Sequence, residues 1–314
     1  MRRLAVIHHR HMDWVPTLAA AEPRLDIRGC HPRDLEQMEA AWLSEAEGLF
    51  CWKLPEGLAA RMPRLAWVQN SGAGVDHLVG HPELPPDVPI TRADGSFGLW
   101  MARYVCGHLL HEAQRIDACR EAQAEARWKP ALIPEDLTGR SALVLGFGRI
   151  GRVIARALRE LGMEVTGLAT RSREEDGFTV RPWSEGAALL PQARLLVLCA
   201  PLTAATRNLV DAGFLAQGHA RMTLINVGRG ELLELGALRE ALDSDRLGRA
   251  VLDVFPEEPL PSDHWLWSHP KVTVTPHHSG PSTPAHLIPD IRDNLARFAE
   301  GRPIVNAVDR AQGY

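Results

Sequence analysis

The chain has 314 residues, 45% of them hydrophobic, so it can bury a large core and is long enough for two domains. Its formal net charge of −4 gives no electrostatic reason to expect nucleic acid or an anionic membrane as a partner. No apolar run approaches the length of a transmembrane helix, and the one after Arg3 is too short for a signal-peptide core. The five cysteines are scattered and include no C-x-x-C pair. We therefore expect reduced thiols in a cytoplasmic protein.

Short apolar runs in the first third of the chain alternate with helical and polar segments. Such alternation predicts a parallel β-sheet with helices packed on it. The predicted strands are residues 4–7, 48–52 and 65–68, and a helical stretch that contains Leu58, Ala59 and Met62 separates the last two. Ligands in these folds gather where the strands end, so the residues after each strand are the candidates for function.

Three histidines, His8, His9 and His11, follow the first predicted strand. They could bind a metal ion, or they could be polar residues at a strand end. We favour the second interpretation and predict no metal site.

A glycine-rich loop follows the third predicted strand and has the sequence N-S-G-A-G-V-D over residues 70–76. Two glycines and an alanine allow consecutive backbone N–H groups to converge on an anion, such as a substrate carboxylate. A plain glycine-rich turn is an equal alternative on local grounds.

A long helical pattern begins near residue 95, and we place the first domain boundary there. We expect this helix to run through Arg115 and Arg120 toward the segment Trp128-Lys-Pro130. The polar residues 134–140 then lead to the next strand.

Residues 141–151, S-A-L-V-L-G-F-G-R-I-G, predict a strand, a glycine turn and the start of a helix. Gly146 would permit the tight turn, Gly148 would let the backbone approach a pyrophosphate, and Gly151 would let helix and strand pack closely. The helix N-terminus then offers N–H groups and a partial positive charge to that pyrophosphate. The pattern predicts dinucleotide binding, and an ordinary β–α turn is the alternative.

The next predicted strand, residues 164–169, ends without the carboxylate that would hold a ribose 2′-hydroxyl in an NAD site. It runs instead into Thr170, Arg171, Ser172 and Arg173. Two guanidiniums and two hydroxyls suit a 2′-phosphate, so we predict NADP(H) as the preferred cofactor and NAD(H) as the alternative. The arginines could otherwise be solvated surface charges.

Further apolar runs, residues 195–199, 222–227, 250–254 and 272–274, predict more strands of the same sheet. After the second of these comes Gly228-Arg229-Gly230, and the last two are followed by Glu258 and His277. Arginine, carboxylate and histidine at neighbouring strand ends form a candidate catalytic group. A carboxylate beside an imidazole favours the protonated form of the imidazole, which can then donate a proton in catalysis.

These segments together resemble the D-isomer-specific 2-hydroxyacid dehydrogenases, and most closely their glyoxylate/hydroxypyruvate reductases of the A type. The resemblance covers nearly the whole chain. It rests on S-G-A-G-V-D (71–76), G-F-G-R-I-G (146–151), A-P-L-T-A-A-T (200–206), I-N-V-G-R-G (225–230), L-D-V-F-P-E-E-P (252–259) and T-P-H-H (275–278). The A-type likeness rests on T-R-S-R (170–173), R-W-K-P (127–130) and the terminal V-D-R-A-Q-G-Y.

The resemblance implies a role for each catalytic candidate. Arg229 would bind the substrate carboxylate and carbonyl, His277 would donate the proton, and Glu258 would orient and charge that histidine. The loop at Ala73, Gly74 and Val75 would receive the carboxylate, and Asp253 would face the nicotinamide carboxamide. The other expected cofactor contacts are Arg149, Ile150, Pro201, Thr206 and Val227. Trp52 and Trp100 are candidate walls of the substrate pocket, with core packing an equal alternative.

The resemblance also implies an α/β fold of two lobes. One is a Rossmann-type, doubly wound parallel sheet that binds the cofactor (residues 97–281), and the other is a smaller, flavodoxin-like substrate domain (1–96 and 282–314). A homodimer through the cofactor domain is expected, with Trp128 near the contact. Arg103 and His278 depart from the usual family residues, which leaves the substrate and the working imidazole open.

We therefore expect NADPH-dependent reduction of a small 2-oxo acid, such as glyoxylate or hydroxypyruvate, to the D-2-hydroxy acid. The alternatives are a family member with a bulkier substrate, one with another donor such as formate or phosphite, and a non-catalytic dinucleotide sensor. A sensor would need only the glycine fingerprint, so the presence of Arg229, Glu258 and His277 argues against it.

Overall fold

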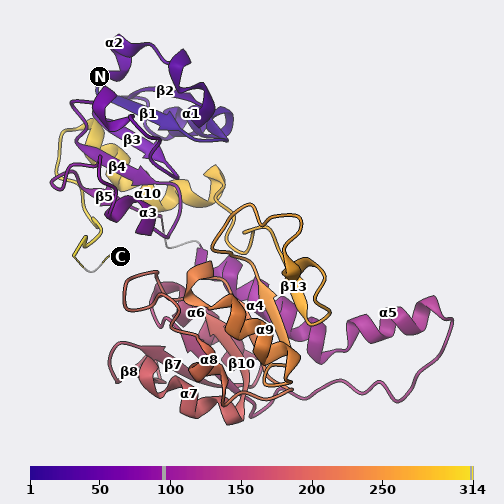
Figure 1. Ribbon diagram of the computed structural model, residues 1–314. Helices are drawn as coiled ribbons and strands as arrows, with labels where there is room; N and C mark the ends of the chain where they lie inside the picture. Colours follow the sequence, from indigo (N-terminus) through magenta and orange to yellow (C-terminus); the bar gives the residue numbers. More distant parts are fainter. Residues whose placement is uncertain (94–96, 312, 314) are drawn as a thin grey trace. The chain divides into compact units, whose positions relative to one another are not determined.

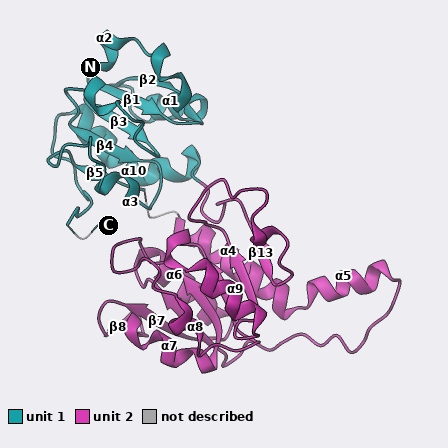
Figure 2. Ribbon diagram, viewed as in Figure 1, with its two compact units in different colours: residues 1–96, 282–314 teal, residues 97–281 magenta. Residues whose placement is uncertain are grey.

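The computed structural model describes residues 1–93, 97–311 and 313. It divides into two compact units (Figures 1 and 2). Unit 1 comprises Met1–Ser96 with Ser282–Tyr314, and unit 2 comprises Phe97–Pro281. The predicted start of a helix at Gly95 lies outside the described residues.

Unit 1 is built on a parallel sheet with the strand order β2-β1-β3-β4-β5, which is the flavodoxin-like order. Its strands are β1 (Arg3–Ile7), β2 (Asp26–Cys30), β3 (Gly48–Cys51), β4 (Trp67–Asn70) and β5 (Ile90–Thr91). Its helices are α1 (His11–Ala21), α2 (Ala40–Leu43), α3 (Asp76–Val79) and α10 (Pro284–Ala299). Helix α10 packs on α1, so both ends of the chain build this unit.

Unit 2 is built on a larger sheet with the order β13-β12-β11-β10-β6-β7-β9-β8. All of its pairings are parallel except that of β8 with β9. The strands are β6 (Ser141–Leu145), β7 (Glu164–Ala169), β8 (Arg173–Glu175), β9 (Phe178–Pro182), β10 (Ala193–Leu198), β11 (Thr223–Asn226), β12 (Arg249–Leu252) and β13 (Val272–Val274). The chain runs β6, β7, β9 to one side and β10 to β13 to the other, which is the doubly wound Rossmann arrangement.

Helices cover both faces of this sheet because alternate strand residues point to opposite faces. Ala142 and Val144 of β6 join the core beneath α4 (Phe97–Ala113) and α6 (Arg149–Glu160). Leu143 and Leu145 join the core beneath α8 (Ala212–Leu215) and α9 (Leu235–Asp243). The short α7 (Gly186–Leu189) contacts α8. The predicted fold class, parallel α/β with a Rossmann-type domain, is confirmed.

Two of the predicted helices are wrong in extent. The long helix is broken at Arg115, whose φ of 55° is left-handed, into α4 and a separate α5 (Ile116–Ala124). Figure 1 shows α5 and the loop after it extending away from the sheet of unit 2. The stretch around Leu58 and Met62 forms only a 3₁₀ turn, Ala59–Arg61, because Pro63 stops the helical pattern there.

The histidines after β1 lie at a strand end. His8 is buried, and its Nδ1 accepts a hydrogen bond from the backbone N–H of Arg10 at 3.0 Å. Burial, reinforced by the charges of His9 and Arg10, lowers the pKa of His8 to about 3. Across the described ranges, no three His, Cys, Asp or Glu side chains are placed to hold a metal ion. In the same ranges, no helix is long and apolar enough to cross a bilayer.

Candidate active site

The glycine turn after β6 lies at the point where the strand order reverses, between β6 and β10. Gly146 has a φ of 101°, and a Cβ atom there would clash with the backbone nitrogen of Ala200 after β10. A side chain on Gly151 would clash with the carbonyl oxygen of Gly146. Only glycine therefore allows this close packing, as the sequence predicts for both positions.

Gly148 differs from its two neighbours because it faces open space. A Cβ atom there would meet no described heavy atom within 4 Å. Gly148 caps α6, and no side chain within the described residues caps this helix end. The turn thus offers unobstructed backbone and the N-terminus of α6 to an anion, which fits the pyrophosphate of a dinucleotide.

The four residues Thr170 to Arg173 are exposed, but their two arginines have different surroundings. Arg173 donates from Nε to the Glu175 carboxylate at 2.7 Å and from Nη2 to the carbonyl of Phe147 in the glycine turn at 2.9 Å. Arg171 makes no ion pair or hydrogen bond within the described part of the chain. Arg171 is therefore available to an incoming anion, whereas Arg173 braces the turn against β8.

The remaining predicted cofactor residues line the same strand ends. Arg149 and Ile150 begin α6, Pro201 is exposed after β10, and Val227 is buried after β11. Thr206 is also buried, and its hydroxyl accepts from the N–H of Thr203 at 2.8 Å and donates to the carbonyl of Pro201 at 2.7 Å. Thr206 therefore shapes the loop that carries Pro201, and direct contact of its hydroxyl with a cofactor stays a prediction.

Arg229 lies in a turn that a buried asparagine holds in shape. Asn226 ends β11, donates from its side chain to the carbonyl of Arg229 at 2.9 Å and accepts from the N–H of Gly228 at 3.1 Å. Gly230 lies so close to the Phe255–Pro256 backbone that a side chain would clash with it. These contacts bring the turn after β11 against the turn after β12.

Glu258 and His277 come together as predicted. Nδ1 of His277 donates to Oε2 of Glu258 at 2.8 Å, and Oε1 of Glu258 accepts from the N–H of Phe255 at 3.0 Å. Burial raises the pKa of Glu258, but these hydrogen bonds and the charges of His277 and Arg229 outweigh it, so the pKa lies below its usual value. Glu258 is therefore a carboxylate at neutral pH, and the charge of Arg229 is close enough to affect it.

The segment that carries His277 is anchored on a fully buried carboxylate, Asp253. Oδ1 of Asp253 accepts from the Thr275 hydroxyl at 2.6 Å and the N–H of His278 at 3.0 Å, and Oδ2 accepts from the N–H of Ser279 at 2.9 Å. The predicted contact of Asp253 with a nicotinamide stays a prediction, since both of its oxygens are already engaged. The ring of His278 lies edge-on to Tyr104 with centroids 5.7 Å apart, while His277 is the imidazole that Glu258 holds.

The glycine-rich loop after β4 belongs to unit 1 and is also shaped by an asparagine. Asn70 donates from its side chain to the carbonyls of Gly72 and Gly74 at 3.1 and 2.7 Å. In the described ranges, no acceptor is paired with the backbone N–H of Ala73 or Gly74. The ring of Trp52 packs on Gly72 and lies 4.7 Å from the His77 ring, between centroids. The side chain of Val75 is buried in the core of the unit.

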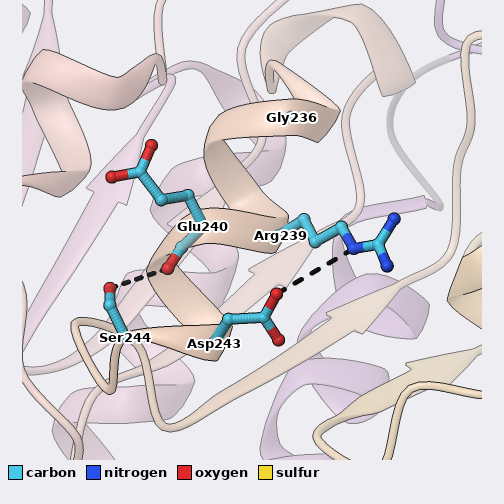
Figure 3. A pocket seen from close by; sticks show the side chains of 5 residues that line it. All are labelled: Gly236, Arg239, Glu240, Asp243 and Ser244. Carbon is cyan, nitrogen blue, oxygen red and sulfur yellow. Dashed lines mark hydrogen bonds and ion pairs between the residues drawn. The ribbon is translucent and has the colours of Figure 1, made fainter.

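A shallow hollow on the surface of α9 is not connected with these residues. It is lined by Gly236, Arg239, Glu240, Asp243 and Ser244 (Figure 3). The paired charges of Arg239 and Asp243, 3.9 Å apart, lie on successive turns of one helix. The hollow includes no strand end and no predicted site residue.

Sequence reasoning missed the supporting residues Asn70, Asn226 and Tyr104. The signal for the two asparagines was available, because each is the last residue of a buried strand and precedes a glycine-rich turn. A buried amide at such a position must find backbone partners. Tyr104 carried no such signal, since its partner lies 171 residues away in sequence.

Comparison with known proteins agrees with this geometry. The family described as "D-isomer specific 2-hydroxyacid dehydrogenase, NAD binding domain" matches residues 106–279. The chain belongs to this family. The predicted family and enzyme class, a D-2-hydroxyacid dehydrogenase with a nicotinamide-dinucleotide domain, are thereby confirmed.

Individual members of the family can also be compared. A glyoxylate/hydroxypyruvate reductase A of Salmonella heidelberg is 33% identical over 313 residues, 96% of either chain. A D-isomer specific 2-hydroxyacid dehydrogenase from Xanthobacter autotrophicus Py2, solved with NADPH and MES, has a TM-score of 0.89 and 34% identity over 100% of this chain and 99% of that one. An NADPH-dependent glyoxylate/hydroxypyruvate reductase from Sinorhizobium meliloti, solved with NADP and sulfate, has a TM-score of 0.85 and 29% identity over 100% of both chains.

Two single-methyl substitutions distinguish the roles of the turn glycines. Gly148→Ala adds a methyl group in open space, so we expect an unchanged melting temperature but weaker dinucleotide binding, by about 10-fold or more because the backbone can no longer approach the pyrophosphate. Gly146→Ala forces a clash and an unfavourable φ, so we expect a lower melting temperature. Calorimetry and fluorescence titration with NADPH measure the two effects. Unimpaired binding by the folded Gly148→Ala variant would contradict this placement of the pyrophosphate.

Proposed function

We propose that the protein reduces a small 2-oxo acid of the glyoxylate/hydroxypyruvate class to the D-2-hydroxy acid, with NADPH as the preferred donor. The observation that carries the proposal is the Glu258–His277 pair at 2.8 Å, beside the turn of Arg229 and within the NAD binding domain. The names of the reductases from Salmonella and Sinorhizobium support the substrate class.

The proposed chemistry assigns each charged group one task. When bound, the nicotinamide supplies the hydride. His277 donates a proton from Nε2 to the carbonyl oxygen, because Nδ1 is held by Glu258 and the carboxylate stabilises the imidazolium. Arg229 binds the carboxylate of the substrate and polarises its carbonyl. The N–H groups of Ala73, Gly74 and Val75 also bind the carboxylate, and Trp52, beside this loop, limits the size of the substrate side chain.

We propose that Arg171 makes the main contact with the 2′-phosphate of NADPH. It is the arginine of the 170–173 segment that no carboxylate engages, whereas Arg173 is paired with Glu175. Thr170 and Ser172 add hydroxyl groups on the same exposed segment. A carboxylate in place of Arg171 would repel the phosphate, so the charge here decides between the two cofactors.

We expect the wild-type enzyme to oxidise NADPH faster than NADH when glyoxylate or hydroxypyruvate is the substrate. NADPH oxidation should be slower with a bulkier 2-oxo acid than with these two. Arg171→Ala should raise KM for NADPH about 10- to 150-fold, because it removes a charge-assisted hydrogen bond, and leave KM for NADH unchanged. Initial rates followed at the absorbance of the reduced nicotinamide measure both.

The matched control is Arg181→Ala on β9, another exposed arginine, whose partner is Glu185 at 3.3 Å. It should change neither KM. Equal use of NADH and NADPH by the wild-type enzyme would contradict the cofactor proposal while leaving the reductase proposal intact.

The lowered pKa of Glu258 predicts a pH dependence. The Glu258 carboxylate stays charged through mildly acidic pH. Its ion pair with His277 is therefore fully present above the ordinary pKa of a glutamate, and it is lost only as the pH falls through the lower pKa of Glu258 in the folded protein. Glu258→Gln keeps an acceptor for Nδ1 but removes the charge. We expect kcat to fall about 100-fold at neutral pH, because the proton donor loses its counter-charge, and initial rates with NADPH and glyoxylate measure the loss.

His277→Ala and Arg229→Ala are the companion variants. Each should lose about 100-fold or more in kcat/KM. Activity that survives either substitution largely intact would refute the catalytic assignment.

We further propose a homodimer that forms through the arm of unit 2, residues 114–136. Large apolar side chains are exposed on this arm, with Trp128 at 94% and Ile133 at 74%. Exposed apolar groups of this size mark an interaction surface. A cytoplasmic location also stays a prediction, supported by the five free cysteines.

Trp128→Asp tests the dimer. We expect the variant to be monomeric in light scattering after size exclusion, since a carboxylate cannot be buried unpaired in an apolar interface. Trp267→Asp is the control, because Trp267 is also exposed, at 54%, but lies outside the arm. A wild-type monomer, or dissociation by the control alone, would contradict the proposal.

A further inference from the structure

The backbone of His277 has a conformation that needs support. Its φ is 50°, in the left-handed region that residues other than glycine rarely adopt. Its N–H donates to the carbonyl of Asp253 at 2.9 Å, and also to that of Thr275 at 3.1 Å. The direction of its imidazole therefore depends on how firmly residues 275–279 are held.

A hydrogen-bonded chain from α4 holds this segment. The Tyr104 hydroxyl lies 2.7 Å from the Thr275 hydroxyl, which lies 2.6 Å from Oδ1 of Asp253. A carboxylate can only accept, so the single proton of the Thr275 hydroxyl is directed to Asp253 and Tyr104 must donate to Thr275. Burial raises the pKa of Tyr104, which keeps the phenol protonated for this purpose.

The ring of Tyr104 is also held by neighbouring rings. It lies against the ring of His108 on α4, with centroids 4.5 Å apart, and the ring of His278 meets it edge-on. Further along the same two segments, a Cβ atom on Gly280 would clash with Phe97 at the start of α4. Residues 275–280 are thus fastened to α4 at several points.

We propose that Tyr104 is a positioning residue, which fixes the orientation of His277 through Thr275 and Asp253. This inference rests on the proposed function, because it assigns the proton to His277. The described hydrogen bonds and ring contacts of Tyr104 are with Thr275, His108 and His278 and not with Glu258 or His277, so its effect passes through the anchored segment.

Tyr104→Phe removes the hydroxyl and keeps the ring. We expect kcat with NADPH and glyoxylate to fall about three- to tenfold, the range for one lost hydrogen bond, with KM for the acid unchanged. Hydrogen exchange of the amides in residues 275–281 should become faster, because His278 and Ser279 donate to the carboxylate that Tyr104 helps to hold.

Thr275→Val should have a similar effect, and adding Tyr104→Phe to it should cause no further loss of kcat, since the link is already broken. Thr273→Val is the matched control. Thr273 lies on β13 two residues earlier, and its hydroxyl accepts from Arg249 at 3.4 Å, outside this chain of hydrogen bonds. It should leave kcat and exchange in residues 275–281 unchanged.

Hydrogen exchange separates the two proposals. If the wild-type protein reduces no 2-oxo acid, the proposed function fails, and exchange alone decides whether Tyr104 anchors residues 275–281. If the wild-type enzyme is active and the Tyr104→Phe variant has the same kcat, Tyr104 is not a positioning residue, even if amide exchange in residues 275–281 of the variant is faster. Unchanged exchange would overturn the anchoring role directly.

Discussion

A buried carboxylate must find donors for its oxygens, and the end of β12 is organised around that requirement. Asp253 is fully buried, and it receives one hydroxyl and two backbone N–H groups from residues 275–279. Without these donors the charge would be too costly to bury. The order of the His277 segment, and with it the meeting of His277 and Glu258, follows from the need to satisfy Asp253.

Two turns that carry predicted substrate-binding residues, one in each unit, are shaped in the same way. Asn70 and Asn226 each end a parallel strand, and each uses its side-chain amide to fix the backbone of the glycine-containing turn that follows. An amide can donate to carbonyls and accept from N–H groups; Asn226 does both, whereas Asn70 donates to two carbonyls. Asn70 thus holds the carbonyls of Gly72 and Gly74, and Asn226 holds the backbone on both sides of the Gly228–Arg229 peptide bond.

Local patterns in the sequence were enough to predict nine of the thirteen described strands and the dinucleotide turn, but not β2, β5, β8 or β9. They also placed Glu258 and His277 at strand ends, whereas the pairing of the two came from the family resemblance. Parallel strands place their carboxyl ends at one edge of the sheet, so residues far apart in sequence could be predicted to lie close together. The break at Arg115 was not predictable in this way, because the apolar pattern continues into α5 and the left-handed residue is an arginine. Nor was the hydrogen bond from Arg173 to the carbonyl of Phe147 in the glycine turn, because the two residues lie 26 positions apart in sequence. Side-chain partners across long separations depend on packing that no local pattern encodes.

Arg171 and Arg173 differ in their hydrogen bonds, and this difference affects which substitutions the segment can accept during evolution. Arg173 donates a hydrogen bond from β8 to the glycine turn, so its replacement would disturb the conformation of that turn. Within the described residues, Arg171 makes no ion pair or hydrogen bond. If Arg171 binds the 2′-phosphate as proposed, substitutions at this one position would alter the choice of electron donor without breaking a described ion pair or hydrogen bond, so the enzyme could move between the NADPH and NADH pools of a cell by a small number of nearly neutral steps.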